Sequence, residues 1–196
     1  MFSQTPFNVC VREDEGVLSF TRDDMLAYAG LEQLIASGVA LRLLSQAFAD
    51  LSPDEYPERD EIRILTAFPG KGVHDCLELV TRCVTRRRFV LDTSAAPDGA
   101  PTTPVGGAMY YEVAYRGRAF SYTFSPDIFD NKWRRQVALY TNGAETVEAH
   151  AAYVAYKYAV LGELMTRPDV FASTGPCDPA RLMALVPVKE VKRPRY

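Results

Sequence analysis

Histidine and closely paired cysteine are scarce in this chain of 196 residues, which contains two histidines and four cysteines. Cys10, Cys76, Cys83 and Cys177 are widely spaced and form no Cys-x-x-Cys pair. A structural zinc site needs four soft ligands, usually in two closely spaced pairs. We therefore expect neither a metal site nor a cofactor, and we interpret the cysteines as thiols of a reducing compartment.

The chain also lacks a charge excess and any long apolar run. Its formal net charge is −3, whereas a nucleic-acid-binding domain usually carries a clustered basic excess. The basic runs at 86–88 and 189–195 are short and are typical of a solvated turn and tail. No apolar stretch has the length of a membrane span, and residues 1–11 do not resemble a signal peptide. We expect a cytoplasmic protein that binds neither nucleic acid nor membrane.

Hydrophobic periodicity predicts one α+β domain over 1–196, in which a proline-rich tail at 167–196 wraps the surface. Apolar residues recur at helical spacing in four segments, at 21–50 (broken in two near Gly30), 73–85, 131–140 and 145–165. Residues expected to face the core on these helices include Leu31, Val84, Val147, Ala151 and Tyr158.

Alternating apolar residues predict strands at 7–11, 17–20, 61–68, 88–93, 109–115 and 120–124. The helix between 61–68 and 88–93 is a crossover, so these two strands should be parallel neighbours. The last two strands form a hairpin that turns at Arg116-Gly117. The four strands between 61 and 124, with the helices around them, indicate one mixed sheet with helices on one face.

The most suggestive segment for function runs from Phe68 to Asp75, where a predicted strand ends and a helix begins. Gly70 and Gly72 allow the backbone to approach a ligand, and Lys71 adds positive charge at the helix N-terminus. This pattern favours a site for a carboxylate or phosphate, although its spacing is not that of a Walker motif. The alternative is a tight turn that needs glycine geometry.

Five side chains near this turn or in the apolar helix are candidates for chemistry. His74 is suited to act as acid or base near neutral pH, with Lys71 holding the anion and Asp75 orienting or capping. Glu78 lies one turn further and could face the same cleft. Arg42 lies in an apolar stretch, where a buried ion pair or anion binding would explain its charge.

Tyrosines gather on the predicted hairpin and on the last helix, where amphipathic rings suit an interface or a pocket. These residues are Tyr110, Tyr111, Tyr115, Tyr122, Tyr153, Tyr156 and Tyr158. We predict a homodimer interface, with a substrate-pocket wall that includes Tyr110, or plain core packing, as the alternatives.

The order of elements over Asp24–Phe124 resembles the FmdE-like family, which is named after a component of formylmethanofuran dehydrogenase. The resemblance is carried by Ser37-Gly38-Val39-Ala40-Leu41 in the first long helix and by Val73-His74-Asp75-Cys76-Leu77-Glu78 in the second. It implies a core of helix, strand, helix and three strands.

The resemblance does not extend to the metal ligands of that family. The family's histidine position falls on Leu34, and its two cysteine positions fall on Ala36 and Gly72, while its aspartate matches Asp75. Apolar side chains offer no lone pairs to a transition metal. The resemblance therefore implies the family's fold without its metal chemistry.

Two functions of different class follow. The first is a metal-independent enzyme that transfers protons, as a lyase or isomerase does, on a small molecule bearing a carboxylate or phosphate. The second is a non-catalytic ligand-binding protein or subunit that keeps the fold. The cluster of Lys71, His74 and Asp75 favours the enzyme, and the shortage of histidine favours the binding protein.

Overall fold

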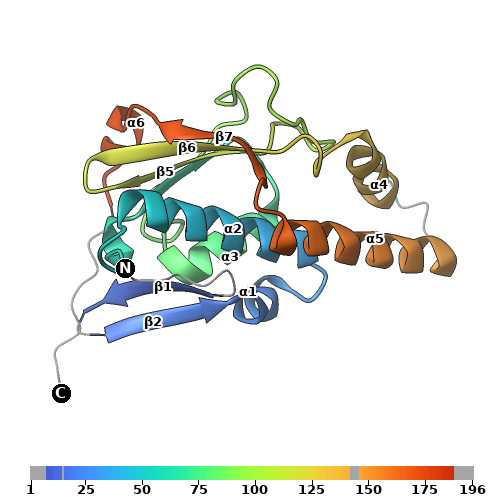
Figure 1. Cartoon of the computed structure of the whole chain (residues 1–196), viewed down its shortest axis with the longest axis horizontal. Coiled ribbons are helices and arrows are strands. Elements are labelled where there is room, and N and C mark those ends of the chain that lie inside the picture. The colour runs from blue at the N-terminus through green and yellow to red at the C-terminus, as the bar shows by residue number, and fades with distance from the viewer. Residues whose placement is uncertain (1–7, 15, 142–145, 188–196) are drawn as a thin grey trace.

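The computed structural model of the chain describes residues 8–14, 16–141 and 146–187. In these segments six helices accompany a mixed sheet of five strands and a separate sheet of two strands (Figure 1). The α+β class predicted from the sequence is confirmed.

The five-stranded sheet has the order β4-β3-β5-β6-β7. Its strands are β3 Arg63–Thr66, β4 Phe89–Leu91, β5 Tyr110–Tyr115, β6 Arg118–Phe124 and β7 Phe171–Pro176. β3 and β4 run parallel on either side of a crossover helix, as the sequence predicted, and the other pairs are antiparallel. The C-terminal end of β3 therefore meets the N-terminal end of β5.

Three layers are stacked in the molecule (Figure 1). The large sheet forms one outer layer, and α2 (Leu34–Leu51) and α3 (Lys71–Thr81) lie beneath it. The opposite outer layer is the hairpin of β1 (Asn8–Glu13) and β2 (Gly16–Thr21), followed by α1 (Arg22–Ala29). A helix between two layers must be apolar on most of its circumference, which is why α2 reads as a nearly continuous apolar run.

Contrary to the expectation from the sequence, the length and composition of α2 alone would let it cross a membrane, yet 61% of the segment is buried inside the fold. A core helix of a globular protein has the same composition, because it too exchanges water for apolar neighbours on several sides. We interpret α2 as the central core helix.

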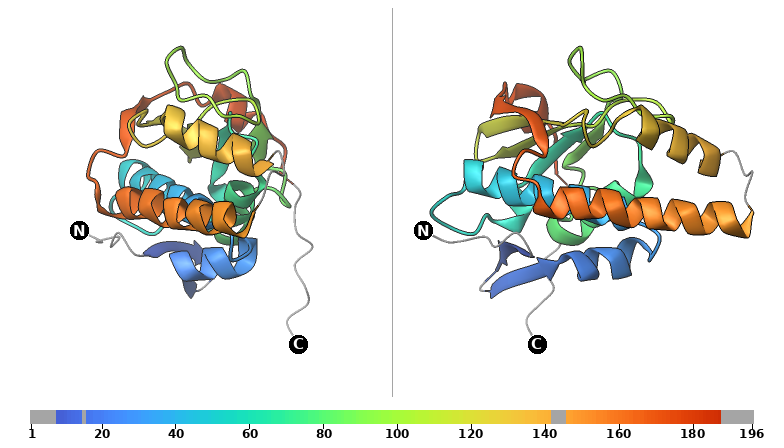
Figure 2. Two further views of the ribbon diagram at one scale, coloured as in Figure 1. Left: turned by 90° about the vertical axis from the view of Figure 1, so that its right-hand side faces the viewer. Right: turned by 45° about the vertical axis from the view of Figure 1, so that its right-hand side comes forward.

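The helices α4 (Asn131–Thr141) and α5 (Val147–Thr166) extend from one end of the layers (Figures 1 and 2). The C-terminal half of α5 packs closely on α2 at Gly38, where an added Cβ would lie 2.8 Å from a methyl group of Leu161. The absence of a side chain at Gly38 thus sets how closely the two helices approach.

The strands near the N-terminus pair with each other in a sheet of their own. One detail of the predicted topology was wrong. The tail from Arg167 contains β7 and the short helix α6 (Ala180–Met183), which covers the second face of the large sheet through the buried Leu182. Pro176 and Gly175 interrupt the alternation of apolar and polar residues in β7, so the sequence did not predict this strand. Phe7, residues 142–145 and residues 188–196 lie outside the described part.

Several residues expected in the core are exposed because the helices begin, end or project differently. Leu31 is 78% exposed because α2 begins only at Leu34, and Val84 is 42% exposed because α3 ends at Thr81. On the projecting part of α5, Val147 is 82% and Tyr158 59% exposed, and Ala151 is exposed too. Among the described residues, no other layer covers that face of α5.

Two buried arginines hold the C-terminal end of α3. Arg59 donates from Nε to the carbonyl of Val80 over 2.8 Å, and Arg88 donates from Nη2 to the carbonyl of Thr81 over 2.8 Å. Arg88 is 1% exposed, and its Nη1 also donates to the carbonyl of Ile62 just before β3. Positive charge at a helix C-terminus satisfies carbonyls that have no intrahelical partner and stabilises the helix dipole. These contacts fix α3 against the sheet.

We expect Arg88→Met to lower the free energy of unfolding by about 3 kcal/mol, because two buried carbonyls lose their charged donor. Arg82→Met, at an exposed residue that ends the same helix, should change stability by less than about 0.5 kcal/mol. Urea denaturation of both variants measures the difference, and equal stabilities would contradict the structural role given to Arg88.

Candidate functional site

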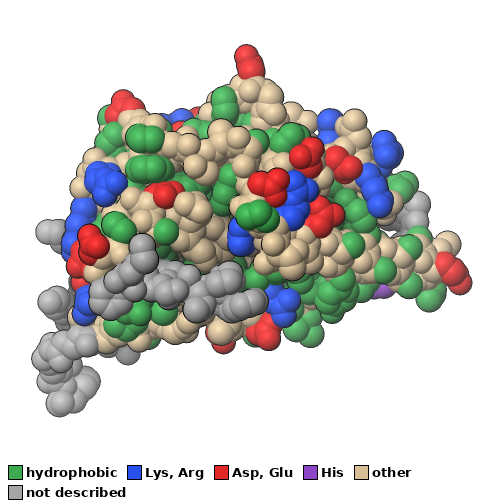
Figure 3. Space-filling model, viewed as in Figure 1, with side chains coloured by type: hydrophobic (Ala, Val, Ile, Leu, Met, Phe, Trp, Pro, Cys, Tyr) green, Lys and Arg blue, Asp and Glu red, His purple; other side chains and the backbone are tan. Residues whose placement is uncertain are grey.

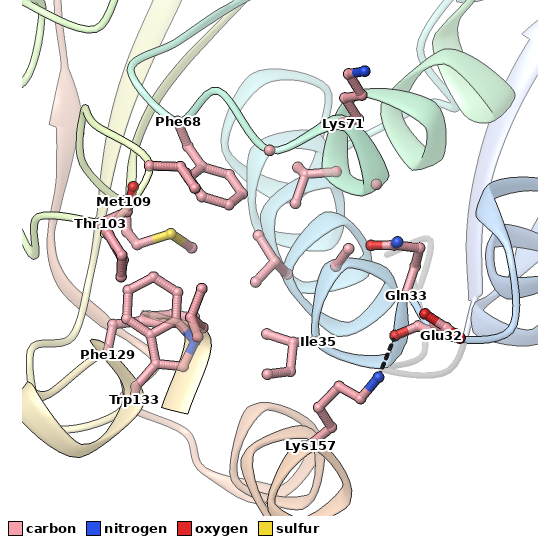
Figure 4. Close-up of a pocket in the computed structure, with 18 of the residues that line it drawn as sticks. Glu32, Gln33, Ile35, Phe68, Lys71, Thr103, Met109, Phe129, Trp133 and Lys157 are labelled. Atoms are coloured by element: carbon pink, nitrogen blue, oxygen red, sulfur yellow. Dashed lines mark hydrogen bonds between the residues drawn. The ribbon is translucent and has the colours of Figure 1, made fainter. Parts of the chain in front are cut away.

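A cavity of about 360 Å³ lies where α3 begins, between the start of α2, the end of the sheet and the α4–α5 pair (Figure 4). Most of its lining is apolar. The lining residues are Glu32, Gln33, Ile35, Ala36, Val39, Phe68, Gly70, Lys71, Gly72, Val73, Thr103, Pro104, Val105, Met109, Phe129, Trp133, Val137, Tyr153 and Lys157.

Aromatic side chains and a thioether form one wall of the cavity, and aliphatic side chains of α2 form the other (Figure 4). Phe129 and Trp133 pack edge to face with ring centroids 5.0 Å apart, and both are buried. Met109 and Val39 are buried as well, whereas Lys71, Glu32 and Val105 are exposed. The exposed residues mark the opening, and the buried ones mark the floor. Apolar side chains are also exposed elsewhere on the surface of the protein (Figure 3). Exposed apolar residues alone therefore do not identify the cavity.

Lys157 and two tyrosines connect α5 and α4 to the turn before α2 at one edge of the cavity. The buried Lys157 ammonium donates to the carbonyl of Glu32 over 3.1 Å (Figure 4) and lies 5.0 Å from the ring centroid of Tyr153. The Tyr140 hydroxyl donates to the Glu32 carboxylate over 3.1 Å and its ring stacks on Tyr153. These contacts hold the α4 wall of the cavity in place.

The predicted ligand-binding turn lies at the cavity, and both of its glycines are needed for close packing. A Cβ at Gly70 would lie 2.2 Å from the ring of Phe68, and a Cβ at Gly72 would lie 2.1 Å from Oε1 of Gln33. Gly70, Lys71 and Gly72 all line the cavity. The Lys71 side chain, however, extends from the opening toward solvent (Figure 4).

His74 does not line the cavity, although it lies in the first turn of α3. Its Nε2 lies 2.8 Å from the carbonyl of Phe68, so Nε2 carries the proton and donates. Its ring packs edge to face on Phe89 of β4 with centroids 4.8 Å apart. Burial lowers the pKa of His74, with smaller opposing contributions from the Phe68 carbonyl and Asp75. The hydrogen bond from His74 thus holds the backbone of Phe68, and the ring of Phe68 forms part of the cavity wall.

The other predicted site residues do not line the cavity. Asp75 is exposed on α3. Glu78, expected to face the same cleft, is buried, and its carboxylate accepts from the backbone N–H of Val84 over 2.7 Å beyond the end of α3. Arg42 donates to the carbonyl of Arg167 over 3.0 Å. Among the described residues, the partner of Arg42 is this carbonyl and not an acidic side chain.

The hairpin tyrosines are core residues. Tyr111 and Tyr122 are fully buried, and Tyr115 is 4% exposed. Tyr110 is buried on the opposite face of the sheet, where its hydroxyl donates to Glu112 over 2.8 Å. The hairpin therefore offers no aromatic interface. On α5, Tyr153 lines the cavity, whereas Tyr110, the tyrosine predicted for the pocket wall, does not.

Sequence reasoning missed most of the cavity wall. Gln33 lies at the start of α2, Trp133 on α4 and Lys157 on α5, so no local pattern joins them. One signal was present: Phe129 and Trp133 are large apolar residues beside predicted loops and helix starts, away from any periodic core face. The positions of these residues in the sequence did not predict that they line one cavity.

Comparison of the chain with models of known protein families found no match, and a comparison with curated proteins found none either. The resemblance to FmdE-like proteins therefore stays a prediction. Of the three positions where that resemblance placed metal ligands, Ala36 and Gly72 line the cavity and Leu34 is buried. Within the described residues, no group of three or more His, Cys, Asp or Glu side chains is arranged to hold a metal.

The lowered pKa of His74 predicts a pH dependence of stability. Below the unfolded pKa of 6.5, the unfolded chain binds a proton more readily than the folded chain. We expect the free energy of unfolding to fall as the pH is lowered from about 7 to about 5.5. His74→Gln, which keeps a donor for the Phe68 carbonyl, should make this fall smaller.

Urea denaturation at several pH values tests this expectation. The comparison with His74→Gln isolates the contribution of His74, because the other titratable groups are the same in both proteins. Identical pH profiles for the wild type and His74→Gln would show that His74 is not buried as described.

Proposed function

We propose that this protein is a non-catalytic ligand-binding module for a small amphipathic molecule. The apolar body of the ligand fills the cavity, and its carboxylate or phosphate lies at the opening, beside the N-terminus of α3. The observation that carries this proposal is an apolar cavity of about 360 Å³ that ends at the Gly70-Lys71-Gly72 turn.

The apolar body follows from the composition and burial of the lining. Ile35, Val39, Phe129 and Trp133 present hydrocarbon to the cavity, so an apolar group placed there loses contact with water and gains dispersion contacts. A volume near the lower end of the usual range for ligand pockets suits a small metabolite better than a large cofactor.

The anionic group follows from the electrostatics of the opening. The N-terminus of α3 carries a partial positive charge, and the ammonium of Lys71 lies in the same turn. An anion placed there keeps part of its hydration, so the cost of its burial is small.

Binding is favoured over proton transfer because His74 lies outside the cavity. The described lining contains no histidine or cysteine, and the Nε2–H of His74 is engaged by the Phe68 carbonyl. A general acid or base must be within hydrogen-bond reach of the atom it protonates. The acid–base enzyme predicted from the sequence would need Phe68 to move before a ligand could reach His74.

Membership of the FmdE-like family, a cytoplasmic location and a homodimer are further proposals. The four cysteines are free thiols, which supports a reducing compartment. The exposed Val147 and Tyr158 on the projecting α5 support self-association better than the buried hairpin tyrosines do.

The fluorescence of Trp133 gives a direct test of binding, because it is the only tryptophan and lies in the cavity wall. We expect octanoate or octyl phosphate to change its emission and to raise the melting temperature by mass action. Ala36→Leu, which fills part of the cavity, should weaken binding at least about tenfold.

Ala49→Leu adds the same side chain to an exposed position of α2 and serves as the control. It should leave binding unchanged. Equal affinity of the wild type and Ala36→Leu for every probe, or no response to any probe, would contradict the proposed cavity site.

Lys71 should contribute modestly to the affinity for anions. Because its ammonium is exposed and screened, we expect Lys71→Ala to weaken octanoate or octyl phosphate binding roughly two- to fivefold. Octanol, which lacks the charge, should bind both proteins equally. Lys132→Ala, on α4 but outside the lining, is the matched control, and an equal effect of the two variants would exclude a local role for Lys71.

A further inference from the structure

The polar side chain of Gln33 lines the cavity but forms no hydrogen bond that stabilises the described part of the fold. Gln33 precedes the first turn of α2, and its side chain does not cap that helix. Within the described segments its carboxamide makes no hydrogen bond, although the residue is half-buried. Figure 4 shows the carboxamide at the cavity edge beside the first turn of α3. A half-buried amide without a protein partner is costly unless water or a ligand completes its hydrogen bonds.

The position of Gln33 depends on a glycine in another helix. A Cβ at residue 72 would lie 2.1 Å from Oε1, 2.6 Å from Cδ and 3.0 Å from Cγ of Gln33. Gly72 is buried in the first turn of α3 and has no positive φ that would require glycine. Glycine is unfavourable inside a helix relative to alanine. Its presence at residue 72 is explained by the space that the Gln33 side chain occupies.

We propose that Gln33 determines the specificity of the cavity, by donating a hydrogen bond from its carboxamide to the carboxylate of the bound ligand. This inference rests on the proposed function and narrows the ligand to a monocarboxylate with an apolar body. The Gln33 carboxamide, the first turn of α3 and Lys71 lie together at one end of the cavity. They form its polar end, opposite the wall of Phe129 and Trp133.

The number and type of donors favour a carboxylate over a phosphate. Gln33 supplies one planar amide with two N–H donors, and Lys71 supplies a single ammonium that extends toward solvent. A monoanionic, planar carboxylate can be satisfied by so few donors. A phosphate monoester carries up to two charges and three oxygens, so more of its charge would be left without a partner.

The test compares octanoate with octanamide on variants of Gln33, with Trp133 emission as the measure of binding. Gln33→Glu places a second carboxylate at the polar end, and we expect it to weaken octanoate binding at least tenfold. Octanamide is neutral and can donate to the new carboxylate, so its affinity should stay within about threefold of the wild-type value. The ratio of the two affinities is therefore the decisive number.

Gln46→Glu makes the same charge change further along α2, outside the cavity lining, and is the control. It should leave the ratio of octanoate to octanamide affinity unchanged. A ratio that shifts equally in Gln33→Glu and Gln46→Glu would assign the effect to net charge and would overturn the proposal.

Gly72→Ala provides a second, independent variant that alters the position of Gln33 without altering its chemistry. The added methyl group must displace the flexible end of Gln33, so octanoate binding should weaken at least about fivefold. The melting temperature of the free protein should not fall, because alanine is favoured over glycine within a helix. Unchanged octanoate affinity in a folded Gly72→Ala variant would contradict the role given to this contact.

The failure of this inference is distinguishable from the failure of the proposed function. If the wild type binds none of octanoate, octanamide and octyl phosphate, the cavity is not a site for this ligand class, and both statements fail. If the wild type binds both probes and Gln33→Glu keeps their affinity ratio, only the role of Gln33 fails. If octyl phosphate binds more tightly than octanoate and loses affinity in the same variants, the monocarboxylate assignment is wrong.

Discussion

The buried guanidinium groups at the C-terminal end of α3 are the interaction on which the rest of the structure depends. Arg88 joins the last turn of α3 to the residue before β3, and Arg59 joins the same turn to Glu13 of the N-terminal hairpin through a 2.7 Å ion pair. One helix end is thereby fixed to two different layers. Burial lowers the pKa of Arg88 to about 10, so the group remains charged at neutral pH and keeps its carbonyl partners.

Fixing the C-terminal end of α3 also determines where its N-terminus lies. The helix is 11 residues long, so its N-terminus is carried to the C-terminal end of β3, beside the start of α2. The sheet ends there, and the gap is bridged by α4 and α5. The glycines at positions 70 and 72 leave room for the side chains of Phe68 and Gln33, which line this corner. The cavity is a consequence of where these elements end.

The local elements of the core could be predicted because each carries its own periodic pattern. The apolar run of α2, the alternation of β5 and β6, and the crossover between β3 and β4 all follow from side-chain spacing. The turn at Gly70-Lys71-Gly72 was likewise recognisable from its two glycines, and it does line the cavity. Strand β7 was missed because glycine and proline interrupt its alternation, and its pairing with β6 is a long-range contact.

The sequence alone determined the α+β class, the core helix and the turn at the start of α3, because periodicity and turn chemistry act between near neighbours in the chain. Only the tertiary structure decided that His74 faces Phe89 while Gln33 faces the cavity, since a helix presents side chains in all directions and packing selects which face is covered. It also decided that Trp133 and Lys157, from two separate helices, line the same cavity as the first turn of α3. Contacts between such distant segments depend on the geometry of the whole fold, which no local pattern encodes.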